Sequence, residues 1–151
     1  MSIANIRKKI SNVMKYMQED IVDQTINELV DRSPVHTGKF VQSYIAEKSP
    51  RSYPRDPEPT GDIFGLSPHA DESMVKNSAK SALKERAKLI MENNGKVSIN
   101  NKAGHANFVE YLGWVPFGGK KGPYFPFATT NQSIWLKKAS ILLAAKHRAL
   151  K

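Results

Sequence analysis

The sequence predicts an α+β fold made as a single domain over residues 1–151. Two observations lead to this prediction. Three long stretches carry apolar residues every three or four positions, which is the period of an amphipathic helix. The shorter stretches between them alternate apolar with polar residues or contain glycine and proline turns, as strands and hairpins do. A small antiparallel sheet with the helices packed on one face is therefore expected.

The first helix is expected to carry its apolar residues from Ile3 to Leu29 and to be stopped by residues 31–34. Ser2 can cap its start, and Pro34 ends it because the residue before a proline is pushed away from helical angles. Its charges run from basic to acidic, an order that the helix dipole disfavours, so packing or a partner for the basic end must outweigh this penalty. The apolar face comprises Ile3, Ile6, Ile10, Val13, Met17, Ile21, Thr25 and Leu29.

Strands are expected in the ranges 38–45, 96–100 and 111–117. In the first range, Phe40, Val41, Tyr44 and Ile45 supply the apolar residues of a strand, or of a short helix that leads into one. The second range alternates apolar and polar residues. Between these two ranges, five prolines break up residues 46–70. We expect this segment to be an extended loop or arm that reaches over a neighbouring subunit.

The middle helix is expected over residues 72–93, with Asp71 or Ser73 as its cap. Its lysines form either a solvated face or a stripe that faces DNA or a partner. Its buried stripe is predicted to comprise Val75, Ala79, Leu83, Ala87, Ile90 and Met91.

The last helix is expected to be capped by Thr129, Thr130 or Asn131 and to end in basic residues that suit the helix dipole. The residues expected to fill the core from this helix are Ile134, Trp135, Leu136, Ala139, Leu142, Leu143 and Ala145.

The composition excludes several classes of site. The chain has no cysteine, so it has no disulfide, thiolate zinc site or cysteine nucleophile. The histidines lack metal-binding spacing and no catalytic set is recognisable, so we expect no enzyme activity, no metal and no cofactor. No apolar run is long enough to span a bilayer, and the first residues do not resemble a secretory signal, so we expect assembly in the cytoplasm without a membrane. The net charge of +9 indicates nucleic acid or an acidic protein surface nearby, or simply a soluble basic surface.

Glu110 is a lone acid among apolar residues, and burying it without a partner would be costly. On a strand it would share a face with Phe108 and Leu112, whereas the spacing of Ala106 and Gly113 suits a short helix ended by glycine. In either geometry we expect it to pair with a basic group or with backbone amides. It would then hold the strand-to-hairpin junction or a subunit contact.

Two motifs resemble those of the tail-completion and neck proteins of tailed bacteriophages, the head–tail connector family of lambdoid phages. The first is SPVHTGKFVQSY, at residues 33–44, and the second is VSINNKAGHANFVEYLGW, at residues 97–114. This chain has His36 where the family usually has aspartate, and His105 where it usually has tyrosine. The residues that carry the resemblance and are taken as structural motif positions are Pro34, Val35, Thr37, Gly38, Ser43, Asn100 (or Asn101 beside it), Ala106, Glu110 and Gly113.

The resemblance implies a structural virion protein that joins tail to head and surrounds the DNA channel as a ring. It implies a homohexamer as the first choice and a dodecamer as the second. The other expected partners are a head-side connector or portal-adaptor ring, a tail terminator or tail tube protein, and DNA that passes through the channel. The alternatives are a tail terminator protein, or a small basic nucleic-acid-binding module outside the virion. Candidate contacts to subunits or DNA are Arg51, Arg55, Lys120 and Lys121.

Overall fold

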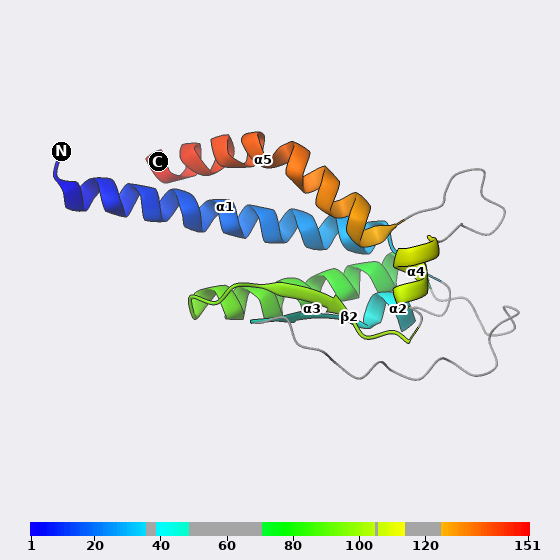
Figure 1. The fold of residues 1–151 in the computed structure, drawn as a ribbon. Helices are drawn as coiled ribbons and strands as arrows, with labels where there is room; N and C mark the ends of the chain where they lie inside the picture. Colours follow the sequence, from blue (N-terminus) through cyan, green and yellow to red (C-terminus); the bar gives the residue numbers. More distant parts are fainter. Residues whose placement is uncertain (36–38, 49–70, 105, 114–124) are drawn as a thin grey trace, which may run out of the picture.

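The fold was analysed in a computed structural model, which describes residues 1–35, 39–48, 71–104, 106–113 and 125–151. These ranges form helices and a small antiparallel sheet, which confirms the predicted α+β class (Figure 1). The elements in order are α1 (Ile3–Asp31), α2 (Lys39–Gln42), β1 (Tyr44–Glu47), α3 (Glu72–Glu92), β2 (Ser98–Asn101), α4 (Ala106–Leu112) and α5 (Pro126–Leu150).

The long helix α1 lies between α5 and α3, and α3 in turn contacts β1 (Figure 1). Helices α1 and α5 run antiparallel, so the two chain termini lie at the same end of the molecule. Their relative position is fixed by ion pairs: Arg148 meets Asp20, and Lys137 meets Glu28. The start of α1 therefore extends beyond the end of α5, and residues 1–11 are exposed.

The two strands pair antiparallel, with Tyr44 opposite Asn101 and Glu47 opposite Ser98. Of the two possibilities for the first range, the structure has the short helix that leads into a strand, namely α2 followed by β1. Because β1 extends to Glu47, the expected arm at 46–70 is wrong at its first two residues, and residues 49–70 lie outside the described ranges.

The expected third strand, at 111–117, is wrong where it can be compared. Tyr111 and Leu112 belong to α4, and residues 114–117 lie outside the described ranges. The reason lies in the spacing of Ala106 and Val109, which are both buried and stand three residues apart, as on one face of a helix. The described sheet is consequently two-stranded.

The core lies where α1, α2, β1, α3 and α4 meet. From α1 it takes Ile26, Leu29 and Val30, which are almost fully buried. Of the two caps predicted for α3, Asp71 is correct, because its side chain accepts a hydrogen bond from the Met74 N–H at 2.7 Å. Met91 is partly buried, and the rest of the predicted α3 stripe is buried: Val75, Ala79, Leu83, Ala87 and Ile90.

Helix α5 differs from its prediction at its start and along its outer side. It begins at Pro126, because proline is well suited to a first helical position, and not after a Thr129, Thr130 or Asn131 cap. Beyond its first turns the buried residues are Ile141 and Ala145. The prediction that the remaining apolar residues fill the core is wrong, because α5 packs mainly on α1 and only one of its faces is covered.

Candidate functional site

The two motif segments meet at one junction. The Asn101 side-chain Nδ2 donates a hydrogen bond to the Phe40 carbonyl oxygen at 2.9 Å, and the Lys102 N–H donates to the Ser43 carbonyl oxygen at 2.9 Å. The Asn101 Oδ1 accepts from the Ala103 N–H at 2.8 Å. A single buried amide therefore ties residues 39–44 to the loop that follows β2.

Of the two asparagines that fit the second motif, Asn100 and Asn101, it is Asn101 that makes these contacts. The Nδ2 of Asn100 is buried and has no hydrogen-bond partner among the described residues. A signal was present in the sequence, because Val97, Ile99 and Asn101 have the same parity and share one face of a strand. Carrying that alternation one step further would have placed Asn101 inside.

Ser33 and Tyr44 form the buried centre of the junction. The Ser33 hydroxyl donates to the Leu29 carbonyl oxygen at 2.7 Å and lies 2.6 Å from the Tyr44 hydroxyl. Because Ser33 has only one proton to give, Tyr44 is the donor in the second bond. Burial raises the pKa of Tyr44 well above its usual range, against the opposing effect of its hydrogen bonds with Ser33 and Asn101, so the phenol stays neutral. Sequence reasoning had not taken either hydroxyl as a site residue.

The Tyr44 ring connects the junction to α5. Its centroid lies 5.7 Å from that of Phe40 and 5.8 Å from that of Phe127, both in edge-to-face geometry. Such pairs stabilise the fold beyond the effect of the area that the rings bury. Residues from α2, β1 and the first turn of α5 thus pack around one phenol.

Glu110 closes the junction from α4. Its carboxylate Oε1 accepts a hydrogen bond at 2.8 Å from the N–H of Phe127, in the first turn of α5. An anion is stabilised there because free N–H groups and the positive end of the helix dipole point toward it. Of the two geometries left open by the sequence, the structure has the helical one, and Gly113 follows α4 with φ 75°, the left-handed angle that favours glycine.

The other candidate residues are placed as follows. Pro34 and Val35 follow α1 and are partly buried, and Val35 packs against the core. The Ser43 hydroxyl donates to the Lys39 carbonyl oxygen at 2.7 Å, and Ala106 is buried at the start of α4. The candidates outside the described ranges are Thr37, Gly38, Arg51, Arg55, Lys120 and Lys121, together with His36 and His105.

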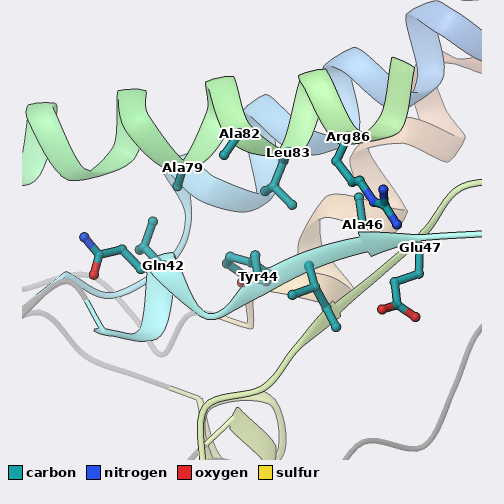
Figure 2. A pocket seen from close by; sticks show the side chains of 10 residues that line it. Gln42, Tyr44, Ala46, Glu47, Ala79, Ala82, Leu83 and Arg86 are labelled. Atoms are coloured by element: carbon teal, nitrogen blue, oxygen red, sulfur yellow. The ribbon is translucent and has the colours of Figure 1, made fainter. Parts of the chain in front are cut away.

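An open groove of about 250 Å³ lies beside the junction, between β1 and α3 (Figure 2). Its walls are mainly apolar and include Val41, Ala79 and Leu83. Arg86 from α3 and Glu47 from β1 lie at one end of it. Within the described ranges no group of histidine, aspartate and glutamate residues is arranged to hold a metal ion. The groove is suited to accepting an apolar side chain.

The lysines of α3 face acids of α1. Lys80 Nζ lies 2.5 Å from a carboxylate oxygen of Asp31, and Lys84 Nζ lies 2.9 Å from one of Asp23. This intramolecular role was neither of the two readings that the sequence had suggested for the basic stripe. It also shows why α1 is acidic near its end, since those acids hold α3 in place despite the helix dipole.

Glu28 holds α5 onto α1. Its carboxylate pairs with Arg32 at 2.5 Å and with Lys137 of α5. Burial alone would raise the pKa of Glu28, but hydrogen bonds from Arg32, Lys137 and Ser133 outweigh it and lower the pKa to about 2. At the other end of the helix pair, the Arg148 guanidinium stacks 4.3 Å from the centre of the Tyr16 ring.

Comparisons of this chain with family models, with curated proteins and with solved structures found no match. None of the helices in the described ranges is long and apolar enough to cross a membrane.

Proposed function

We propose that this chain is a structural virion protein of a tailed bacteriophage, a tail-completion or neck subunit that forms a ring at the head–tail interface. The proposal rests on the two sequence motifs. The observation that supports it is their meeting point: segments separated by more than fifty residues are tied together by Asn101 and by the Lys102 N–H. Motif residues that serve one structural junction fit a subunit whose task is assembly and not chemistry.

The ring is proposed to be a homohexamer, with a dodecamer as second choice. A closed ring uses two different surfaces of each subunit in a head-to-tail contact. The groove between β1 and α3 is suited to be one of them, because it is open, mainly apolar and next to the motif junction. On this proposal, the ring's neighbours are a head-side connector ring on one side and a tail terminator or tail tube on the other.

Two measurements test this function. Native mass spectrometry of the purified chain is expected to give a hexamer, or rings after mixing with tails, and mass spectrometry of purified virions is expected to contain the protein. A chain that stays monomeric under both conditions and is absent from virions would overturn the proposal. Substituting Ala82→Trp, at an exposed position on the groove wall, should block assembly, whereas Leu89→Trp, on the same helix outside the groove, should not.

A basic nucleic-acid-binding module is the second candidate, and the net charge of +9 favours it. Arg7, Lys8, Lys9 and Lys15 lie on the exposed start of α1 without acidic residues among them. Binding to a nonspecific DNA duplex, measured over a range of salt concentrations, distinguishes the two. Contact with phosphates gives a log-linear loss of affinity with salt, and absence of binding at low salt excludes this candidate.

A further inference from the structure

The outer side of α5 carries an apolar stripe that the described chain leaves uncovered. Leu136, Leu143 and Leu150 stand seven residues apart and expose 75%, 56% and 70% of their surface. Seven residues make nearly two helical turns, so the three leucines lie along one line. Ile141 and Ala145, which are buried, point to the other side of the helix.

A second line of apolar residues widens this surface. Trp135 and Leu142 are also seven residues apart and expose 69% and 41% of their surface. The Lys138 ammonium lies 5.1 Å from the centre of the Trp135 ring. We call the surface formed by Trp135, Leu136, Leu142, Leu143 and Leu150 the α5 outer face.

Cations without acidic partners surround the α5 outer face. Helix α5 contains no aspartate or glutamate. Of its bases, Lys137 and Arg148 pair with acids of α1. Lys138 and Lys146 are exposed and form no ion pair with any residue in the described ranges. The α5 outer face therefore combines an apolar stripe with uncompensated positive charge.

The spacing and the charge identify the chemistry of the occupant. A seven-residue repeat of leucine is the pattern by which one helix packs against another. A second copy of α5 would set bases against bases, which is repulsive. A DNA backbone would accept the lysines but would leave the leucines exposed to water.

Lys146 favours a protein helix over a bilayer as the occupant of the α5 outer face. It follows Leu143 by three residues and precedes Leu150 by four, so it lies within the apolar stripe. A bilayer would draw the Lys146 ammonium out to its headgroups, away from the leucines beside it, whereas a helix that carries an acid at that position pairs with it within the stripe. We propose that the α5 outer face is the docking site for an acidic amphipathic helix of a partner protein.

This docking site goes beyond the proposed ring and does not depend on it. The α5 outer face belongs to a helix other than those that form the groove between β1 and α3. Docking can therefore be measured on monomer or ring, and its failure leaves the test of ring assembly unaffected.

The test uses the full chain and two synthetic helical peptides. Both carry leucine at the a and d heptad positions, and the flanking e and g positions are glutamate in one peptide and lysine in the other. Fluorescence anisotropy of the labelled peptides is expected to show binding of the glutamate peptide. Its affinity should be roughly tenfold or more above that of the lysine peptide, because only the glutamates match the charge of α5.

Variants locate the binding to α5. The double change Leu136→Gln with Leu143→Gln is expected to weaken binding of the glutamate peptide by roughly tenfold or more. The matched control is Leu89→Gln, an exposed leucine of α3, which should leave binding unchanged. Lys146→Glu should weaken binding of the glutamate peptide and strengthen binding of the lysine peptide. All these positions are exposed, and unchanged circular dichroism melting of each variant checks that the fold is intact.

Several outcomes would overturn the proposal. They are absence of binding, equal binding of the two peptides, or equal loss with Leu89→Gln. Sedimentation that shows a dimer abolished by the double change would assign the α5 outer face to a second copy. Binding to phosphatidylserine vesicles or to duplex DNA that the double change abolishes, without peptide binding, would assign it to those ligands instead.

Discussion

Helices α3 and α5 have similar sequence character and very different surroundings. Both are long and basic and carry apolar residues in helical periodicity. In α3 the apolar stripe is buried and the lysines meet acids of α1. In α5 much of the apolar surface is exposed and two lysines lack an acidic partner in the described chain. The difference teaches that periodicity reveals an apolar face without telling whether the same chain covers it.

The difference has a geometric cause. Helix α3 contacts α1, α2 and β1, which surround its apolar stripe. Helix α5 contacts α1 along its length and α4 near its start. One covering helix buries one face, so the second apolar face of α5 is left to solvent or to a partner.

The largest contrast is expected from truncating one leucine in each helix. Leu83→Ala in α3 should lower the free energy of unfolding by about 2–5 kcal/mol, because Leu83 is buried and a cavity is left behind. Leu143→Ala in α5 should change it by less than about 0.5 kcal/mol, because Leu143 is exposed. Urea unfolding of both variants measures this. Similar losses would mean that the isolated chain already buries Leu143.

The next contrast concerns the charged attachment of α5 to α1. The pKa of Glu28 is about 2 in the folded chain and near its ordinary value of about 4.3 in the unfolded chain. Glu28 therefore stabilises the fold fully above about pH 4.3, and this contribution is lost as the pH falls toward 2. Wild type should be more stable than Glu28→Gln by about 3 kcal/mol at pH 7.

The free energies of unfolding of wild type and Glu28→Gln, measured from pH 7 to pH 2, should converge as Glu28 becomes protonated. The control is Glu85→Gln, at an exposed acid of α3. The free energy of unfolding of this variant should differ little from that of wild type at every pH. A Glu28 gap that is the same at both pH values would contradict the assigned pKa.

A smaller contrast lies at the helix starts. Helix α3 is capped by its own Asp71, whereas α5 has no local side-chain cap and receives the Glu110 carboxylate from α4. Asp71→Ala and Glu110→Ala should each lower the free energy of unfolding by about 1 kcal/mol. Glu110→Gln should lower it by less, because the amide keeps an acceptor and loses only the charge.

Thermal unfolding of the three variants measures the effect of the caps. Hydrogen exchange at the Phe127 N–H distinguishes the Glu110 variants from Asp71→Ala, because only the Glu110 variants should lose protection there. A Glu110→Gln variant as protected as wild type would show that the charge contributes nothing at this position.

The smallest contrast concerns the lysines. Lys80→Ala should lower the free energy of unfolding by roughly 0.2–1 kcal/mol, because it removes a partly exposed ion pair with Asp31. Lys138→Ala should leave it unchanged or raise it slightly, since no acid faces it in the described chain. Chemical denaturation at low and high salt measures both. The Lys80 effect should shrink with salt, and a loss of equal size for Lys138→Ala would reveal a partner for it.

Much of the fold follows from local sequence. Ser2 caps α1 and accepts the Asn5 N–H at 3.3 Å, and Asp71 caps α3, both as expected from their chemistry. The α3 stripe is buried as predicted, because residues spaced by three and four positions lie on one side of a helix. Local rules decide these features, since each depends on residues within one or two turns.

Tertiary structure decided what depends on distant neighbours. The sequence raised Glu110 as an acid that needs a partner, and the fold supplied the N–H of Phe127. The sequence placed Trp135 and Leu136 on the last helix with apolar character, and the fold left them exposed because α1 covers only the opposite face. Periodicity and capping are short-range properties, whereas burial and charge pairing depend on which segments meet, and that is settled only when the chain packs.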